Sequence, residues 1–485
     1  MAIPSLAMIP SGYKEGKVYS VLPTNGDGDF TFSRGSNATR VNKDGLIETM
    51  PLELGEELVT NGDFATDSDW IKGSGWSISG GEANCSGSGT GQVLYQQNIM
   101  PLGTKYKITV TVSSFVSGYL SAFGGDWDTE IIQSNGTFTR YTKSLSVNTG
   151  FVGNNFIGSI DNVSVKEVIS GYDTPRLDYT DSSCPSLLLE PQSTNLITYS
   201  EDFSQWSALN NVVVTDNFIT SPDGTQNAAK LVFDGTASGR IELSVSASGT
   251  NTQSIYLKTE SGTQNVSIGA GGVDLTQFTI TDQWVRYTHT GGGDFPRILC
   301  NDSATIYVYG AQLEALSYPT SYIPTNGAIA TRLADVCNSA GNDQVINSSE
   351  GVLYAEIVGL SNPVDSPKNI TISDGTLNNY VRIEYYQDGR VYGNVFDGTN
   401  TAANSVVNQL NFNKVAVQYS SSGCKLYVNG IGVDFASKNF TSNTLNTVQF
   451  SSASGNSDFF HGNVKDVRVY NTALTEQELT DLTTI

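Results

Sequence analysis

Short stretches of alternating apolar and polar residues recur along the whole chain, which is the pattern of strands with one buried face. Clear examples are residues 158–168, 306–316, 381–385, 414–419 and 425–428. Asn-Gly and Asp-Gly pairs occur between the runs, and these residues tolerate the positive φ of tight turns. The pattern therefore predicts an all-β protein built from tandem antiparallel β-sandwich modules.

A single short helix is predicted, at the C-terminal end. Thr475 is placed to cap it, and Glu478 completes a Thr-x-x-Glu capping box. Leu474 and Leu479 stand at the positions of a hydrophobic staple. We expect this helix to lie along the edge of the last sandwich.

Three landmarks occur twice in the same order, which indicates two copies of one module at residues 51–170 and 191–320. Each copy begins with an apolar run that leads through acidic residues and Phe to Trp, has an aromatic-x-Arg-Tyr motif in its second half, and closes with an alternating strand. The paired landmarks are Glu57–Trp70 with Leu187–Trp206, Phe138–Tyr141 with Trp284–Tyr287, and Gly158–Val168 with Ile306–Leu316.

The remaining segments are predicted to form a framework around these copies. Residues 171–190 resume the kind of sequence found in residues 1–50. The first module is therefore interpreted as an insertion at an exposed turn of the framework. Residues 321–344 read as an extended connector, because X-Pro steps near its start disfavour helix. We expect residues 345–485 to form a third sandwich with a core of its own.

The charge of the chain restricts its partners. It has 48 acidic and 26 basic residues and a formal charge of −22, which repels the phosphate backbone of nucleic acids and anionic membrane surfaces. No stretch resembles a signal peptide or is apolar enough to span a bilayer, so we expect no membrane insertion. The five cysteines are widely spaced and are expected to be buried free thiols.

The segments Phe412–Val433 and Gly462–Leu479 resemble the concanavalin A-like, laminin-G-like family. The resemblance covers roughly residues 345–485 and implies two packed antiparallel sheets. Phe412 stands where the family usually has Trp. Where members of this family bind a ligand, they do so at loops on one rim.

The two repeated modules resemble carbohydrate-binding, galactose-binding-like jelly rolls. The first carries Asn61-Gly-Asp-Phe64 and Ile160-Asp-Asn-Val163, and the second has the more degenerate Ser200-Glu-Asp-Phe203 and Gly310-Ala-Gln-Leu313.

The jelly-roll resemblance implies a structural calcium ion in the first module, held by Asn61, Asp63 and Asp161. The alternative is that Asp161 is only a polar residue at a strand start. Aligning Gln312 with Asp161 predicts that the second module lacks the ion.

The framework segments 11–48 and 175–206 resemble those of virion structural proteins of tailed bacteriophages. The resemblance implies a place on the virion as a fibre, a tail protein or a capsid-bound appendage. Other virion proteins and a host-surface glycan are the implied partners. Because virion appendages repeat, a homo-oligomer is expected, with a trimer favoured.

A candidate glycan-binding site lies around Trp127. Asp126 and Asp128 flank this residue in a loop-like stretch, so an exposed indole could stack on a sugar ring while the carboxylates accept hydroxyl hydrogen bonds. Tyr119 is a candidate second wall of the site. The alternative, equally compatible with the sequence, is a Trp that packs back onto its own module.

Catalysis has little support in the sequence. His289 and His461 are the only histidines, and neither belongs to a Ser or Cys triad motif. We therefore expect a non-enzymatic protein that acts in adhesion or particle decoration. A polysaccharide depolymerase of the virion and a bacterial surface adhesin are the alternatives.

Overall fold

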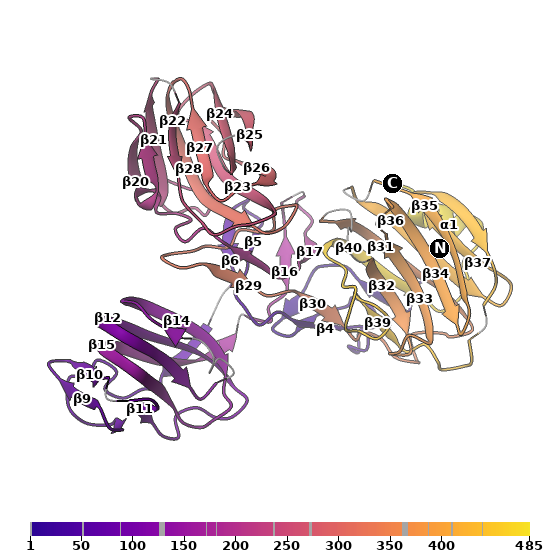
Figure 1. The fold of residues 1–485 in the computed structure, drawn as a ribbon. Helices are drawn as coiled ribbons and strands as arrows, with labels where there is room; N and C mark the ends of the chain where they lie inside the picture. The colour runs from indigo at the N-terminus through magenta and orange to yellow at the C-terminus, as the bar shows by residue number, and fades with distance from the viewer. Residues whose placement is uncertain are drawn as a thin grey trace. The chain divides into compact units, whose positions relative to one another are not determined.

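The structure is a computed structural model, and it describes residues 2–50, 53–87, 89–125, 131–170, 172–180, 182–235, 238–270, 274–360, 367–386, 388–408, 411–438 and 440–485. Antiparallel strands dominate these residues, and their one α-helix is α1, Glu476–Thr483 (Figure 1). The all-β fold class with a short C-terminal helix is confirmed. No helix in the described ranges has the length and apolar character needed to cross a bilayer.

The chain divides into two compact units. One unit is residues 51–171, and the other joins residues 1–50 to residues 172–485. Segments on the two sides of the first module contact each other within the second unit: Tyr179 N donates to Val41 O at 3.1 Å, and Val41 N donates to Asp178 Oδ1 at 2.9 Å.

The first module is one nine-stranded sheet around a single core. Bulges interrupt the pairing of its two longest strands between Ser113 and Ser117, where Ser114 has φ 52°, and bulges of this kind bend and twist a sheet. Its strands are β7 Glu53–Glu57, β8 Ile71–Lys72, β9 Trp76–Ser79, β10 Glu82–Ser86, β11 Gln92–Gln96, β12 Lys105–Phe123, β13 Ile131–Ile132, β14 Gly136–Lys143 and β15 Thr149–Ser170.

The second module is a sandwich of two five-stranded sheets, ordered β20-β21-β28-β23-β26 and β19-β22-β27-β24-β25. Alternate residues such as Ile255 and Leu257 enter the core between the sheets. The strands are β19 Ser207–Leu209, β20 Val213–Ile219, β21 Ala228–Asp234, β22 Gly239–Glu242, β23 Thr250–Thr259, β24 Thr263–Ala270, β25 Asp274–Thr281, β26 Val285–Gly292, β27 Pro296–Cys300 and β28 Ser303–Glu314.

The C-terminal sandwich packs an eight-stranded sheet against a five-stranded one, β35-β34-β33-β32-β39. The larger sheet has the order β16-β17-β40-β31-β36-β37-β38, with β1 also paired to β40. The strands are β1 Leu6–Met8, β16 Arg176–Asp178, β17 Ser186–Leu189, β31 Glu350–Gly359, β32 Lys368–Ser373, β33 Asn379–Tyr385, β34 Arg390–Asp397, β35 Asn400–Val406, β36 Asn413–Ser420, β37 Cys424–Val428, β38 Ile431–Phe435, β39 Thr447–Gln449 and β40 Gly462–Tyr470.

The expectation that residues 345–485 hold a core of their own is wrong. Framework strands β1, β16 and β17 belong to the larger sheet, and framework side chains such as Leu6, Phe30 and Leu187 are part of the same apolar cluster as the sandwich. The cause is that β40 accepts β1 and β17 as further pairing partners. The framework and the C-terminal sandwich therefore share one core.

The rest of the framework consists of short ladders tied by a buried ionic network. Its strands are β2 Tyr13–Lys14, β3 Lys17–Val18, β4 Phe30–Ser33, β5 Thr39–Val41, β6 Ile47–Thr49, β18 Ser193–Asn195, β29 Ala330–Arg332 and β30 Val336–Asn338. The network comprises Arg34, Arg176, Arg332, Glu190 and Asp335, all at most 3% exposed. It joins segments far apart in the sequence, since Arg34 Nη1 meets Asp335 Oδ1 at 3.1 Å.

Helix α1 begins as the sequence predicts. Thr475 and Glu478 form both halves of the capping box, and Leu474 and Leu479 are buried. The helix packs with Val352, Tyr354 and other residues on the outer face of the larger sheet, and it also contacts the edge strand β38. The free thiols are buried except for Cys184, which is exposed.

Candidate functional site

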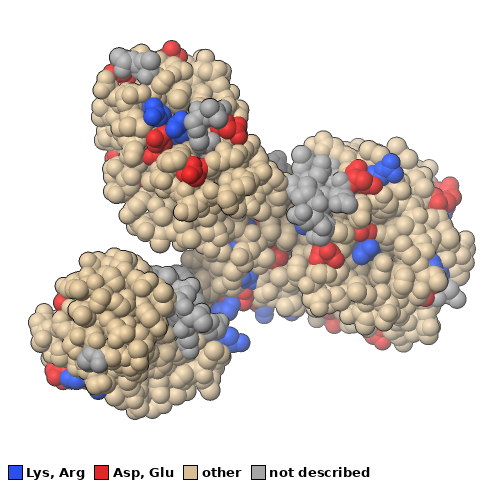
Figure 2. Space-filling model, in the orientation of Figure 1, with Lys and Arg blue, Asp and Glu red and all other residues tan. Residues whose placement is uncertain are grey.

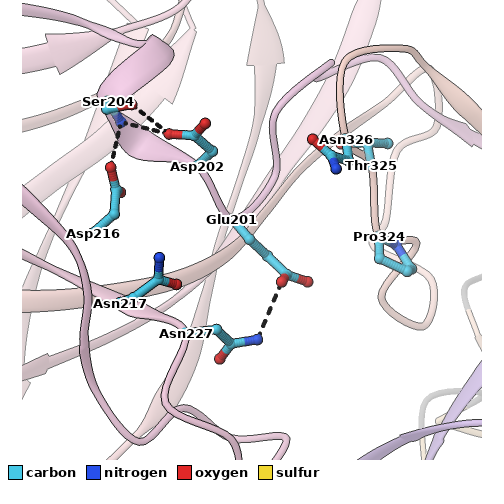
Figure 3. A pocket seen from close by; sticks show the side chains of 9 residues that line it. All are labelled: Glu201, Asp202, Ser204, Asp216, Asn217, Asn227, Pro324, Thr325 and Asn326. Carbon is cyan, nitrogen blue, oxygen red and sulfur yellow. Dashed lines mark hydrogen bonds between the residues drawn. The ribbon is translucent and has the colours of Figure 1, made fainter. Parts of the chain in front are cut away.

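A polar pocket of about 540 Å³ opens in the second module (Figure 3). Three stretches of chain bring its lining together: the entrance loop of the module, the end of β20 with the turn before β21, and the connector after β28. The lining residues are Glu201, Asp202, Ser204, Asp216, Asn217, Asn227, Pro324, Thr325 and Asn326.

A buried aromatic pair fixes the entrance loop. The rings of Phe203 and Trp206 pack in a tilted arrangement with centroids 5.3 Å apart, and Trp206 Nε1 donates to Tyr199 O at 3.0 Å. Between the two rings the chain makes one turn of 3-10 helix, Phe203–Gln205. Asp202 caps this turn, because its Oδ1 accepts from Ser204 N at 3.1 Å. The aromatic anchor thus sets the position of one wall of the pocket.

Asp216, from β20, reaches the same turn from the other side. Its carboxylate accepts from Phe203 N at 3.0 Å and from Ser204 N at 3.2 Å. Burial raises the pKa of Asp216, and the nearby Asp202 carboxylate raises it further. The two carboxylates converge on Ser204 in Figure 3. This convergence gives one end of the pocket an excess of hydrogen-bond acceptors.

Glu201 occupies the middle of the pocket between Asn227 and the connector (Figure 3). Its carboxylate accepts from Tyr322 Oη at 2.8 Å, Asn227 Nδ2 at 3.1 Å and Tyr309 Oη at 3.3 Å. Burial is the main cause that raises the pKa of Glu201, and the Asp223 carboxylate adds to the rise. Glu201 is therefore oriented by a set of hydroxyl and amide donors.

Two buried polar atoms of the lining have no hydrogen-bond partner in the described part of the chain. They are Thr325 Oγ1, on a residue only 8% exposed, and Asn227 Oδ1. Buried polar atoms are nearly always satisfied in native proteins, by protein groups or by ordered water. Among the described residues, the lining contains carboxylates and amides but no Lys or Arg. Such a site suits a ligand rich in hydroxyl groups, which both donate and accept.

The two modules share their entrance geometry. Phe64 and Trp70 pack with centroids 5.2 Å apart, and Trp70 Nε1 donates to Asn61 O at 3.0 Å. In the first module Val163 N donates to Gly62 O at 2.8 Å. This bond closes the entrance segment against the exit strand β15.

The matching bond in the second module runs from Ala311 N to Ser200 O at 2.9 Å. The residue before each donor has positive φ, 50° at Asn162 and 64° at Gly310. By this geometry Asp161 corresponds to Tyr309, so aligning it with Gln312 was wrong. Gln312 instead ties down the connector, since its Oε1 accepts from Ile323 N at 2.6 Å.

The predicted calcium ligands lie on adjacent segments of the first module. The Asn61 side chain is engaged with its own loop, donating to Thr66 O at 2.7 Å and accepting from Thr66 N at 3.2 Å. Asp161 accepts from Asn162 N at 2.6 Å, and Asp63 is exposed. Three or more His, Cys, Asp or Glu side chains grouped to hold a metal are absent from the described residues. Both oxygens of Asp161 accept from Asn162, and Asp63 Oδ1 accepts from Ala65 N, so the calcium remains a prediction.

The predicted glycan site in the first module is only partly described. Asp126, Trp127 and Asp128 lie outside the described residues. Tyr119 is half-buried on β12, opposite Asn154 of β15. Its role stays a prediction.

The two histidines lie in different parts of the chain. His289 Nδ1 is 2.8 Å from Thr276 Oγ1, and its Nε2 is 3.6 Å from Asp274. His461 belongs to the C-terminal sandwich, where burial lowers its pKa to about 3. Neither histidine lines the pocket of the second module.

Residues 361–480 match the family described as the concanavalin A-like lectin/glucanases superfamily. No curated protein matches the chain significantly.

The charges on the face seen in Figure 2 are scattered in small groups over a mainly uncharged surface.

Solved structures that match part of the chain include the CBM40 domain of the Ruminococcus gnavus IT-sialidase bound to α2,3 sialyllactose, at 17% identity and TM-score 0.26, covering 30% of this chain and 93% of that one. Another is a mutant of the NanB sialidase of Streptococcus pneumoniae, at 15% identity and TM-score 0.25, covering 29% of this chain and 25% of that one. A third is domain 4 of the GH43 arabinanase AbnA of Geobacillus stearothermophilus with arabinotriose, at 13% identity and TM-score 0.26, covering 35% and 84%.

Sequence reasoning missed the pocket because its walls come from residues 201–227 and 324–326. The Ser200-Glu-Asp-Phe203 motif was recognised as a degenerate module entrance. The signal that could have indicated the pocket was the density of acidic and amide residues in residues 201–227. The contribution of residues 324–326 from the connector depends on the tertiary fold.

Proposed function

We propose that the protein binds glycans without cleaving them, and that the pocket of the second module is a binding site. The observation that carries the proposal is a polar pocket of about 540 Å³ whose described lining brings the carboxylates of Glu201, Asp202 and Asp216 together with amide and hydroxyl side chains. Sugar hydroxyls donate hydrogen bonds to such carboxylates and exchange them with the amides beside them. The match of residues 361–480 to a lectin and glucanase superfamily supports the same class of function.

The pocket can be tested with a variant that leaves the fold alone. Asn326 is exposed, and its side chain has no hydrogen-bond partner among the described residues, so Asn326→Ala removes a contact to ligand and little else. On a glycan array the whole chain is expected to bind a defined set of glycans, and Asn326→Ala to bind them roughly tenfold more weakly. The control is Asp282→Asn, because Asp282 is an exposed residue of the same module that does not line the pocket.

The proposed setting is the surface of a tailed-phage particle, as a fibre, tail protein or capsid-bound appendage. The support is the resemblance of the framework segments together with the tandem β-sandwich architecture. Mass spectrometry of purified particles is expected to detect the protein. Its presence in uninfected cells instead would favour a bacterial adhesin.

The rival activity is depolymerisation of a host polysaccharide. Incubating the protein with purified polysaccharide and measuring reducing ends separates binding from cleavage. We expect binding without new reducing ends, and a steady release of reducing ends would replace the proposal by a glycosidase function.

A further inference from the structure

A row of alternating aromatic and cationic side chains crosses the outer face of one sheet of the second module. Its members are Phe218 on β20, Lys230 on β21, Tyr307 on β28, Lys258 on β23 and Trp284 just before β26. The register places both lysines opposite Tyr307, one on each neighbouring strand. The five residues therefore occupy successive positions across the whole width of the sheet.

The alternation of each strand turns these side chains away from the core. Ile306 and Val308 are fully buried in the core, so Tyr307 between them faces outward. By the same rule Lys258 follows the buried Leu257 onto the outer face. Phe218 is 44% exposed and both lysines are half-buried. The row is thus open to solvent at Phe218 and at the two lysines.

The lysines lie over the aromatic rings. Lys230 Nζ is 4.7 Å from the centroid of Phe218, and Lys258 Nζ is 5.5 Å from Trp284 and 5.6 Å from Tyr307. Phe218 and Tyr307 are stacked with centroids 6.0 Å apart. Cation–π contacts at exposed sites contribute only about 0.5–1 kcal/mol each. They orient the ammonium groups and leave most of their charge unneutralised.

Neither lysine has an ion-pair partner in the described residues. In the described ranges, carboxylates come within 4.0 Å of many cations, but of neither Lys230 nor Lys258. The acidic group nearest to the row by hydrogen bonding is Glu260, which accepts from Tyr307 Oη at 3.4 Å. In a chain of charge −22, two unpaired ammonium groups on one face are available to an external anion.

We propose that this row binds a saccharide whose sugar rings carry carboxylate groups. Lys230 and Lys258 flank one strand, so their attachment points are about 10 Å apart, a span suited to acidic groups on a short stretch of glycan. Carboxylates pair with the ammonium groups, and apolar sugar faces pack on Phe218 and Trp284. The proposal rests on glycan binding as the function but uses a site separate from the pocket.

The test compares acidic glycans with their uncharged derivatives on the full chain. The probes are a labelled oligogalacturonide and a labelled oligosialic acid, each alongside its methyl ester. The wild-type chain is expected to bind at least one acid roughly tenfold more tightly than its ester. Raising the salt concentration from about 0.1 M to about 1 M should weaken binding of the acidic glycan, because the Debye length falls from about 10 Å to about 3 Å.

Lys230→Gln with Lys258→Gln is expected to abolish the preference for the acid. Lys465→Gln is the matched control, since Lys465 also lies over an aromatic ring, 3.7 Å from the centroid of Phe412, but in the C-terminal sandwich. Unchanged melting of the double variant checks its fold. The proposal is overturned if neither acid binds, if acid and ester bind equally, or if the control loses the preference to the same extent.

The pocket variant Asn326→Ala separates this proposal from the pocket. It should leave binding of the acidic probe unchanged, whereas the lysine variant should leave binding of neutral glycans unchanged. The preference for the acid could instead disappear with Asn326→Ala and survive the lysine changes. That result would assign the acidic glycan to the pocket and overturn the proposal that it binds the row.

Discussion

Trp206 donates its indole N–H to the carbonyl of Tyr199 at 3.0 Å while packing against Phe203, and Trp70 repeats this arrangement with Asn61 and Phe64. Trp206 is 4% exposed and Trp70 is 7% exposed. The same anchor therefore holds both module entrances, and in the second module it also holds one wall of the pocket.

Trp206→Ala is expected to lower the free energy of unfolding of its module by about 3–5 kcal/mol, because it removes a large buried side chain. Urea denaturation followed by circular dichroism measures the loss. Trp70→Ala is the matched change in the first module and should cost a similar amount. A loss below about 1 kcal/mol at either position would show that the pair is not an anchor.

The buried ionic network predicts a loss of stability in acid. Burial alone would raise the pKa of Glu190, but the Arg332 and Arg176 guanidiniums and the Ser321 hydrogen bonds lower it from 4.5 to about 2. A carboxyl whose pKa is lowered by folding stabilises the protein above its unfolded pKa, and this stabilisation disappears as the pH falls through the folded pKa. The free energy of unfolding should therefore drop by about 3 kcal/mol from this group between about pH 4.5 and about pH 2.

Urea titrations across this pH range measure the effect. Glu190→Gln should flatten the slope in that window, and it should destabilise the protein by about 3–5 kcal/mol at neutral pH because it leaves buried arginine charge unpaired. An identical slope in the variant would remove Glu190 from the explanation.

The shared core predicts which fragments fold. Residues 345–485 alone lack Leu6, Met8, Leu187 and Leu189, which are buried in their core. This fragment should melt without a cooperative transition and bind a hydrophobic dye. Residues 1–50 joined to residues 172–485 keep every framework strand and should melt cooperatively. A cooperative melt of the short fragment would contradict the shared core.

Calcium is proposed for the first module only. A ligand that binds only the folded state stabilises by about 2.7 kcal/mol at a hundredfold excess over its dissociation constant. Chelator should then lower the melting temperature of residues 51–171, and Asp161→Asn should remove that response. The second module has Tyr309 at the matching position and should not respond. Equal responses in both modules, or none, would exclude the ion.

Local patterns were sufficient for the features that depend on local chemistry. The capping box of α1 and the alternation of the strands were read from adjacent residues, and the repeat was visible because Phe and Trp recur at both entrances. The equivalence of Asp161 was misplaced because the two exit motifs share few residue types, and the positive φ that marks the true match at Asn162 and Gly310 leaves little trace in a degenerate repeat.

Features that join distant segments were not predictable. Arg34 and Asp335 are 301 residues apart, and β1 reaches β40 across nearly the whole chain. The pocket likewise needs Glu201 from the entrance and Thr325 from the connector. Each depends on tertiary pairing that periodicity does not encode.

The most direct test of glycan binding is calorimetric titration of the whole chain with a neutral glycan selected on the array. The account predicts saturable binding by the wild type and by Asp282→Asn, and roughly tenfold weaker binding by Asn326→Ala at an unchanged melting temperature. Absence of binding to every glycan on the array, or equal affinity in wild type and Asn326→Ala, would contradict the assignment of the pocket.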